Sequence, residues 1–395
     1  MNEWTRYRTD HLFLLVGTNP LPNYVAALLL AKDDCTIHLL HSRGTAEVAV
    51  RLKQAIQKRR PQGKSPVLRE IDESDSSRIG QKMREILQDI KGQASVGLHY
   101  TGGTKAMAVH VYRAVEKKFT DSVFSYLDAR TLSLRIDKQN EGQTKIIPVE
   151  QACEVKLDDL VALHGRALKP FEKETCLEQT YCILAKLHST HPEVWREWCN
   201  KNLRREKRPD KFKSNTELAK VPLSDHDPVL TSLMTSLGHP ATLKDIPRPN
   251  GWDIEKLAKW LDGPWLEHYV LDCIEQLATS SHVHDFGMDF KTIPEQQGFQ
   301  FDVAAMRGYQ LFALSCTTAF KKERCKEKLF EAYIRARQMG GDEARVALVC
   351  CYDDAVGLRG EIEEAWFTEG RVRVFGRRDL INLPVCLKEW LETAN

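Results

Sequence analysis

Apolar and polar segments alternate through the first third of the chain in the pattern of strands that are each followed by a helix. The segments "HLFLLVG", "TIHLLHS" and "SVGLHY" are short and apolar, as buried strands are. Apolar residues at helical spacing extend from about Pro22 to Lys32 and from Thr45 to Lys58. This alternation predicts a mostly parallel sheet covered by helices, and therefore a doubly wound, Rossmann-like first domain.

The pattern changes twice further along the chain. Helical segments broken by polar stretches fill residues 155–247, and a long helical pattern, "DIEKLAKWLDGPWLEHYVLDCIEQLA", follows. Next come three strand-like pieces, "DFGMDFKTIP", "GFQFDVAAM" and "YQLFALSCTT", then a helix from about Lys321 to Met339, and the strand "RVALVCCY". We therefore expect three parts, residues 1–154, 155–247 and 248–395, of which the first and the last are α/β domains.

Composition limits the class of protein. The chain of 395 residues suffices for two domains, and 42% hydrophobic with 28% charged residues is typical of a soluble protein. The longest apolar run, Tyr24 to Ala31, is far shorter than the roughly 20 residues of a membrane span. The start, "MNEWTRYRTD", lacks the apolar core of a signal peptide. The eleven cysteines are scattered and lack zinc-finger spacing, so we expect reduced thiols, a cytoplasmic location and no membrane partner.

A candidate anion site follows the strand "SVGLHY". The turn "TGGT" and the helix that begins near Lys105 combine two glycines, two hydroxyls and a positive charge at the end of a parallel strand, where open α/β sheets bind ligands. Gly102 and Gly103 let a ligand approach the backbone, and free N–H groups at the helix start favour an anion. The motifs G-x-x-x-x-G-K-[ST] and G-x-G-x-x-G are absent. A tight connection without a ligand is the alternative.

The two strand-to-helix turns resemble those of CARF domains, the CRISPR-associated Rossmann folds that sense cyclic oligoadenylates. The resemblance rests on "HYTGGTKAMA", "GTNPLPNYVAAL" and, as support, "LLHSRGTAEVAVRL", and it covers about residues 11–135. It implies an activator, cyclic tetraadenylate before cyclic hexaadenylate, and a homodimer, because a two-fold ring fits between two copies of one patch. The positions that match the family's ligand contacts are Thr18, Asn19, Ser42, Thr101, Gly102, Gly103, Thr104, Lys105 and Met107.

The last part resembles the PD-(D/E)xK nucleases, which CRISPR ancillary systems join to CARF domains in this order. The resemblance implies a Rossmann-like CARF domain followed by a restriction-endonuclease-like α/β domain. In the nuclease family an aspartate opens the second strand, E-x-K follows on the third, and a leading helix can add an acidic residue. The segment "GFQFDVAAMRGYQLFALSCTT" matches at Asp302, whereas Ser315 and Thr317 stand where the family has its glutamate and lysine.

Nearby residues can supply what the motif lacks. Asp302 and Glu267 are the candidate catalytic carboxylates and the candidate ligands of Mn²⁺ or Mg²⁺, because these ions prefer charged oxygen ligands. Lys322 is the candidate for the missing positive charge, with Lys321 beside it and Lys326 as a further option. The lysines also fit a solvated helix face that pairs with glutamates at helical spacing.

Other polar and aromatic residues have ordinary structural explanations. The basic run "KNLRREKRPDKFKSN", Lys201 to Asn215, fits either a solvated linker or a nucleic-acid backbone. Histidines without further ligands at suitable spacing are typical of surfaces and cores, and tryptophans at helical spacing pack a domain. The residues concerned are His99, His110, His282, His284, Trp252, Trp260 and Trp265, and Glu295 is a spare carboxylate before the Asp302 strand.

Two functions remain open on these grounds. In the first, the chain is a CRISPR type III ancillary effector, a nuclease that cyclic oligoadenylate activates and that cleaves DNA or RNA with a divalent metal in antiviral defence. In the second, it senses the same ring, but its nuclease-like domain is degenerate and binds nucleic acid or a protein. Slow degradation of the ring by the CARF-like domain, with Lys105 positioning it, is a third possibility.

Overall fold

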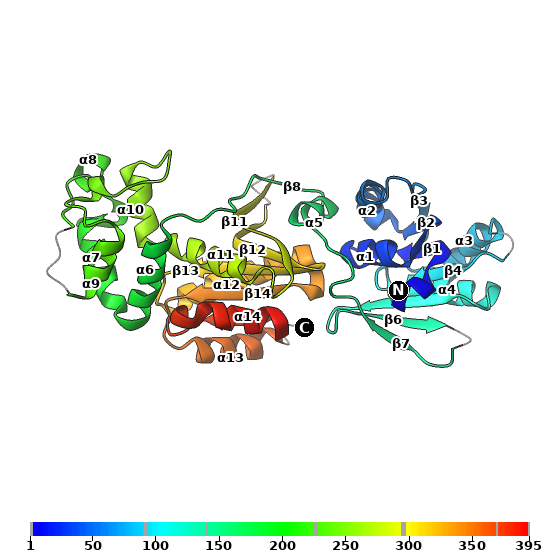
Figure 1. Ribbon diagram of the computed structural model, residues 1–395. Helices are drawn as coiled ribbons and strands as arrows, with labels where there is room; N and C mark the ends of the chain where they lie inside the picture. Colours follow the sequence, from blue (N-terminus) through cyan, green and yellow to red (C-terminus); the bar gives the residue numbers. More distant parts are fainter. Residues whose placement is uncertain are drawn as a thin grey trace.

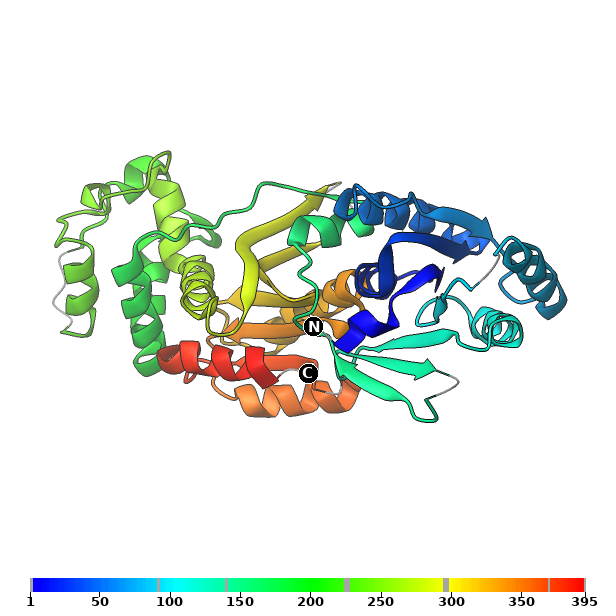
Figure 2. The ribbon, with the colours of Figure 1, turned by 45° about the vertical axis from the view of Figure 1, so that its right-hand side comes forward.

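A computed structural model of the chain contains two α/β domains and a helical region (Figure 1). The structure describes residues 3–90, 93–138, 141–223, 228–293, 298–368 and 370–393. Figures 1 and 2 show the parts in a row, with the first domain at one end, the C-terminal domain in the middle and most of the helical region at the other end. No described helix is both long enough and apolar enough to cross a membrane.

A seven-stranded sheet forms the first domain. Its strands are β1 Thr9–Leu15, β2 Ala31–His41, β3 Val67–Glu70, β4 Val96–His99, β5 Val123–Asp128, β6 Ser133–Lys138 and β7 Lys145–Pro148. Their order is β3-β2-β1-β4-β5-β6-β7, in which the first five are parallel and the last two antiparallel. The chain passes from β1 to β2 on one side, and β4 lies on the other side of β1. The strand order therefore reverses between β1 and β4, which is where open α/β sheets bind ligands.

Four helices cover the two faces of this sheet. They are α1 Leu21–Leu30, α2 Ala46–Arg59, α3 Ser76–Gln88 and α4 Lys105–Lys118. Side chains of β1 alternate between the faces: Leu12 and Leu14 belong to the cluster that contains α1 and α2, whereas Phe13 and Leu15 belong to the cluster that contains α3 and α4. A parallel strand that is buried on both faces reads as a continuous apolar run, which explains "HLFLLVG".

The chain leaves the first domain through helix α5, Leu157–Leu163, and the two-residue strand β8, Ala167–Leu168. Helix α5 packs against α2, and the Val155 N–H donates a hydrogen bond to the Gly308 carbonyl of the C-terminal domain at 2.8 Å. Strand β8 joins the edge of the C-terminal sheet. One hydrophobic cluster contains residues of both α/β domains and of α5, so the two domains pack against each other through a shared core.

The helical region has its own elements before the C-terminal sheet begins. These are α6 Glu178–Thr190, α7 Pro192–Asn202, β9 Arg204–Arg205, β10 Arg208–Phe212, α8 Asn215–Leu218, α9 Pro228–Ser236 and α10 Ile254–Asp262. Trp195 of α7 is fully buried and donates its indole N–H to the Leu261 carbonyl at 3.0 Å. The basic run of the sequence forms the antiparallel hairpin β9–β10, whose residues are mostly exposed.

A six-stranded sheet, of order β15-β14-β13-β12-β11-β8, forms the C-terminal domain. Its remaining elements are α11 Trp265–Leu277, β11 Val283–Ile293, β12 Gln300–Arg307, β13 Gln310–Thr317, α12 Lys322–Gly340, β14 Arg345–Cys350, α13 Ala355–Trp366, β15 Val372–Phe375 and α14 Leu383–Thr393. Strands β11, β12 and β13 are antiparallel, and β13, β14 and β15 are parallel. The structure thus contains the expected order of helix, three strands, helix and strand, followed by α13, β15 and α14.

Candidate functional site

The glycine turn lies at the carboxyl edge of the first sheet, because β4 ends at His99 and α4 begins at Lys105. Thr104 is the N-cap of α4, and its hydroxyl accepts a hydrogen bond from Met107 N at 3.1 Å. The same hydroxyl donates to the Glu73 carbonyl at 2.5 Å. This cap satisfies one backbone donor of α4, which leaves the other N–H groups of the first turn to a ligand.

The packing and backbone conformation of this turn require glycine at both positions, Gly102 and Gly103. A Cβ at Gly102 would lie 2.2 Å from the Leu15 carbonyl oxygen, and a Cβ at Gly17 would lie 3.1 Å from Gly103 N. Gly103 has a φ of +74°, in the left-handed region that favours glycine. The turns after β1 and β4 therefore pack backbone against backbone at the point where the strand order reverses. A ligand at this edge would meet both turns.

Three of the expected ligand contacts are exposed side chains at this edge, namely Thr18, Thr104 and Lys105. The backbone of Gly103 beside them is exposed as well. Lys105 is the first residue of α4, so its charge adds to the positive end of the helix dipole. The ammonium group and the free N–H groups together suit the phosphate oxygens of a nucleotide ligand.

Other expected contacts also hold the loops in place. The Thr101 hydroxyl accepts a hydrogen bond from Leu127 N at 2.7 Å, and Asn19 Oδ1 accepts one from Leu21 N at 3.1 Å. Met107 is 1% exposed and lies under the glycine turn. A change at any of these positions would therefore alter the shape of the edge as well as its surface.

Ser42 extends the same edge beyond the end of β2. Its backbone N–H donates to the Thr45 hydroxyl at 3.1 Å. Ser42 also lines a pocket of about 640 Å³ between the ends of β2 and β3 and helix α3, together with Arg43 and Arg78. The expected ligand positions thus lie at the carboxyl ends of β1, β2 and β4, in the turns that follow them, or in the first turn of α4.

In the C-terminal domain, Asp302 lies on β12 beside β13. Its Oδ2 accepts hydrogen bonds from Ser315 Oγ at 3.0 Å and from Cys316 N at 2.6 Å. Ser315 stands where the E-x-K motif has its glutamate, so the hydroxyl orients the aspartate and adds no second carboxylate. Thr317 lies two residues further on and faces the same side of the strand.

Glu267 supplies the second carboxyl group. It lies half-buried in the first turn of α11. Burial and then the negative charge of Asp302 raise the pKa of Glu267 to about 8, and Lys328 opposes this shift. At neutral pH the Glu267 carboxyl therefore mostly keeps its proton, because burial first and the neighbouring charge of Asp302 second disfavour the carboxylate form.

The candidate lysines at the start of α12 lie away from this pair. Lys322 and Lys326 both form ion pairs with Glu361 of α13. Lys321 is the exposed N-cap residue of α12. The structure therefore places Lys322 and Lys326 between two helices, where their amines face a carboxylate of α13.

Lys328, which is not among the sequence candidates, is a lysine that lies beside Asp302 in the structure. It lines a pocket of about 90 Å³ together with Asp302 and Ser315. Its charge also acts on Glu267 and on the thiol of Cys316. The sequence signal that could have identified Lys328 is its position on α12. It directly precedes Leu329, which belongs to the buried stripe of this helix, so its side chain lies beside the sheet.

The donors present suit a hard divalent ion with few protein ligands. Asp302 and Glu267 offer two carboxylates, and their mutual repulsion is what a bound cation would relieve. Mg²⁺ often binds through one or two carboxylates plus waters and substrate phosphates. Among the described residues, no group of three or more His, Cys, Asp or Glu side chains is placed to hold a metal.

The remaining candidates have structural roles where the structure describes them. His99 is fully buried with Nδ1 at 3.0 Å from Ser125 Oγ, and burial lowers its pKa to about 3. His284 Nε2 lies 2.9 Å from the Gly308 carbonyl oxygen. The tryptophans Trp260 and Trp265 are buried, Trp252 is half-buried, His282 is exposed, and Glu295 lies outside the described residues.

Solved structures with the same fold are known, although no family model and no curated protein matches the sequence. Protein VC1899 from Vibrio cholerae is 18% identical and superposes with a TM-score of 0.75, over 98% of each chain. Can2 from Sulfobacillus thermosulfidooxidans, in complex with cyclic tetra-adenylate, is 13% identical with a TM-score of 0.73, again over 98% of each chain. The likeness confirms the expected α/β fold, in which a Rossmann-like first domain is followed by a second α/β domain.

Proposed function

We propose that the chain is a CRISPR type III ancillary effector that acts in the cytoplasm in antiviral defence. Its activator is a cyclic oligoadenylate, for which cyclic tetraadenylate is the first candidate. The active form cleaves DNA, RNA or both with a divalent metal ion. The fold shared with Can2, whose structure contains cyclic tetra-adenylate, supports the activator. The observation that carries the catalytic half is the grouping of Asp302, Glu267 and Lys328 beside β13.

The ring is held between two copies of the first domain in this proposal. A ligand with two-fold symmetry presents the same atoms twice, and a C2 dimer presents one edge twice. The ring activates the enzyme if it binds the active arrangement of the dimer more tightly than the resting one.

Each residue of the catalytic group has a defined task. Asp302 and Glu267 would hold the ion, which would supply Lewis-acid chemistry at the scissile phosphate. Glu267 releases its proton as it becomes a ligand, because a nearby positive charge favours the carboxylate form. Lys328 places a positive charge near the oxygens that gain negative charge in the transition state. Ser315 orients Asp302 through their hydrogen bond.

The test is cleavage of supercoiled plasmid and of labelled single-stranded RNA with Mn²⁺ or Mg²⁺, with and without cyclic tetraadenylate. We expect cutting that depends on the ring and falls by about 100-fold or more in Asp302→Ala. Asp272→Ala is the matched control, since Asp272 of the same domain accepts a hydrogen bond from Gln276 Nε2 at 3.0 Å on α11 and does not line the Asp302 pocket. Wild-type protein that binds the ring but cuts neither substrate with either ion contradicts the nuclease.

A second function is favoured by the hydrogen bonds at Asp302. Ser315 and Cys316 already satisfy Oδ2 of Asp302, and the signature glutamate and lysine are replaced. The C-terminal domain would then bind nucleic acid or a protein without cutting, under control of the same ring. Ring-dependent binding of nucleic acid that survives Asp302→Ala, together with absent cleavage, identifies this sensor.

A further inference from the structure

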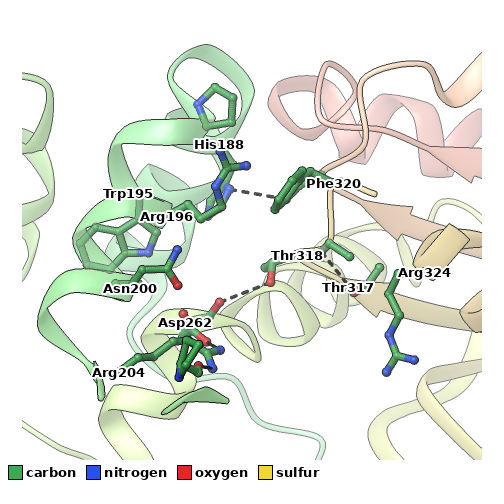
Figure 3. A pocket seen from close by; sticks show the side chains of 15 residues that line it. His188, Trp195, Arg196, Asn200, Arg204, Asp262, Thr317, Thr318, Phe320 and Arg324 are labelled. Atoms are coloured by element: carbon green, nitrogen blue, oxygen red, sulfur yellow. Dashed lines mark hydrogen bonds and ion pairs between the residues drawn. The ribbon is translucent and has the colours of Figure 1, made fainter. Parts of the chain in front are cut away.

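A second cavity opens at the carboxyl ends of β13 and β14, where α6 and α7 approach the C-terminal domain (Figure 3). Its volume is about 380 Å³, within the range of small-molecule and nucleotide pockets. The carboxyl ends of parallel strands are also the usual ligand side of an open α/β sheet. Side chains of the helical region line one wall and the segment after β13 lines the other: Trp195, Arg196, Asn200 and Arg204 face Thr317, Thr318, Phe320 and Arg324.

An arginine stacked on an exposed aromatic ring spans this cavity. The guanidinium carbon of Arg196 lies 3.9 Å from the centre of the Phe320 ring, and Figure 3 shows the two side chains reaching toward each other. Phe320 is 45% exposed. Within the described part of the chain, no carboxylate or other hydrogen-bonding group pairs with the Arg196 guanidinium. Exposed aromatic rings and unneutralised arginines are the groups that hold single-stranded nucleic acid by stacking and charge.

Positive charge continues from the cavity onto the hairpin β9–β10. Arg204 is neutralised by an ion pair with Asp262 at the cavity wall. Residues 204–212, however, include five basic and only two acidic residues, and most of the hairpin is exposed. A charged, exposed hairpin next to a stacking group suits a flexible phosphate backbone that leaves the cavity. The structure therefore places the basic run beside a cavity. This position favours a nucleic-acid contact over a solvated linker.

The wall of the cavity also offers hydrogen-bonding groups of the kind that contact bases. His188 lines it and is 5% exposed, with Nδ1 3.5 Å from Cys351 Sγ. Its Nε2 is buried and has no hydrogen-bond partner within the described residues. A buried polar nitrogen without a partner is costly unless a ligand or water satisfies it. Thr317 adds a hydroxyl to the same wall.

Strand β13 contributes residues to both the cavity and the candidate catalytic group. Ser315 binds Asp302, and Thr317 lines the cavity. These two residues project from the same face of the strand and are about 7 Å apart along it. A strand of nucleic acid held in the cavity would therefore have its next phosphates near Asp302.

We propose that this cavity binds one nucleotide of a single-stranded nucleic acid, with its base on Phe320 and its phosphate at Arg196, and that hairpin β9–β10 holds the flanking phosphates. The inference builds on the proposed function, for which it names the substrate class. Single strands are favoured over duplexes because the bases of a duplex are stacked on each other and cannot enter a cavity unless they are flipped out.

The experiment measures binding without cleavage. Labelled oligothymidylate, oligouridylate and a DNA hairpin duplex are titrated with the full chain in EDTA, with cyclic tetraadenylate, at several salt concentrations. We expect Phe320→Ser to weaken single-strand binding by about tenfold or more, and Phe320→Trp to retain it. Arg196→Gln should lower the slope of log K against log salt by about 0.7. Lys186→Gln, which removes an exposed charge from α6 outside the cavity, is the control.

The possible failures of the two proposals are distinct. Variants at Phe320 and Arg196 that match Lys186→Gln in affinity and salt slope overturn the single-strand site, even if wild-type protein cleaves in the ring-dependent assay. Tighter binding of the duplex than of single strands overturns it as well. Loss of binding in Phe320→Ser supports the site even if no metal ion ever yields cleavage. Cyclic tetraadenylate binding by each variant, measured in parallel, confirms that the protein is folded.

Discussion

At the scale of single residues, one lysine governs the charge of the candidate catalytic group. Burial and then the charge of Asp302 raise the pKa of Glu267, whereas Lys328 and Lys291 lower it, and Lys291 is paired with Asp289 at 2.5 Å. The other cation that lines this pocket, Arg335, forms an ion pair with Glu331. Lys328 is therefore the described cation that can support both the carboxylates and a charged transition state.

Replacing Lys328 tests this role. We expect Lys328→Met to lower kcat for cleavage by about 100-fold or more, because a positive charge is lost where charge develops. Lys326→Met is the matched control, since Lys326 lies on the same helix but pairs with Glu361. Single-turnover cleavage of RNA and plasmid at saturating ring measures the effect. Equal losses in the two variants would show that Lys328 stabilises the helix only.

Glu343 makes stability depend on pH in a defined direction. It is 2% exposed, and burial raises its pKa to about 7, with a further contribution from Asp342 against the opposing charge of Arg345. The folded carboxyl thus binds its proton more tightly than the unfolded one. Stability contributed by the protonated group is present below the unfolded value of 4.5 and is lost as the pH rises through about 7.

Glu343→Gln should remove this dependence. Relative to wild type, the variant should gain up to about 3 kcal/mol of unfolding free energy between about pH 4.5 and about pH 8. Urea unfolding at the two pH values measures the gain. Glu364→Gln, at an exposed position of α13, is the control and should gain nothing. A constant difference between Glu343→Gln and wild type at both pH values would contradict the argument.

At the scale of elements, the packing of the two turns in the first domain leads to a prediction for Gly102. A Cβ there would overlap the Leu15 carbonyl at 2.2 Å, so Gly102→Ala must push the turns apart. We expect a loss of about 1–3 kcal/mol of stability and weaker ring binding. Gly360→Ala is the same substitution at a site with no atom within 4 Å of the new Cβ. Isothermal titration with cyclic tetraadenylate compares the two, and unchanged affinity in Gly102→Ala would place the ring elsewhere.

Buried elements were predictable from sequence, and short or half-exposed ones were not. Strands β1 and β2 contain long apolar runs, and β4 is short but buried at every residue, so all three were expected. Strand β3 has four residues, none of them buried, so it gives almost no pattern. Helix α3 has a usable signal in the sequence, an aspartate N-cap at Asp75 followed by Ile79 and Met83 at helical spacing.

The candidate sites divide in the same way. The glycine turn could be found because Gly102 and Gly103 mark it locally. Its close contact with Leu15 joins segments far apart in the chain, which no local pattern reveals. Among the lysines of α12, the rotation of the helix decides which one reaches Asp302. Packing of the apolar stripe against the sheet fixes that rotation, so Lys328 faces the pocket whereas Lys322 faces α13.

At the scale of the whole molecule, the ligand edge of the first domain touches the C-terminal domain directly. A Cβ at Gly341, in the turn between α12 and β14, would lie 2.1 Å from Asn19 Nδ2. Asn19 belongs to the turn after β1, which also packs against the glycine turn. Helix α12, which carries Lys328, ends at this contact. Movement of the ligand edge therefore has a short mechanical route to the candidate catalytic group.

Gly341→Ala tests whether this contact couples the two sites. The new methyl group would displace Asn19, so we expect a smaller stimulation of cleavage by cyclic tetraadenylate, with residual uncoupled activity unchanged. Gly238→Ala is the control: Gly238 has a φ of +83°, near the +67° of Gly341, but no neighbouring atom within 4 Å. Both substitutions place a Cβ at a positive φ, and of the two only the one at Gly341 meets neighbouring atoms, Asn19 Nδ2 and Glu343 Oε2.

Coupling between two sites is reciprocal in binding free energy, which gives this test a second readout. If Gly341 transmits the signal, nucleic acid bound in EDTA should tighten cyclic tetraadenylate binding in wild type and should do so less in Gly341→Ala. The ring changes the affinity for nucleic acid by some factor, and nucleic acid changes the affinity for the ring. These two factors must be equal within each protein. A Gly341→Ala protein that keeps the wild-type factor would show that the signal crosses the domains elsewhere, for instance through α5 and the shared core.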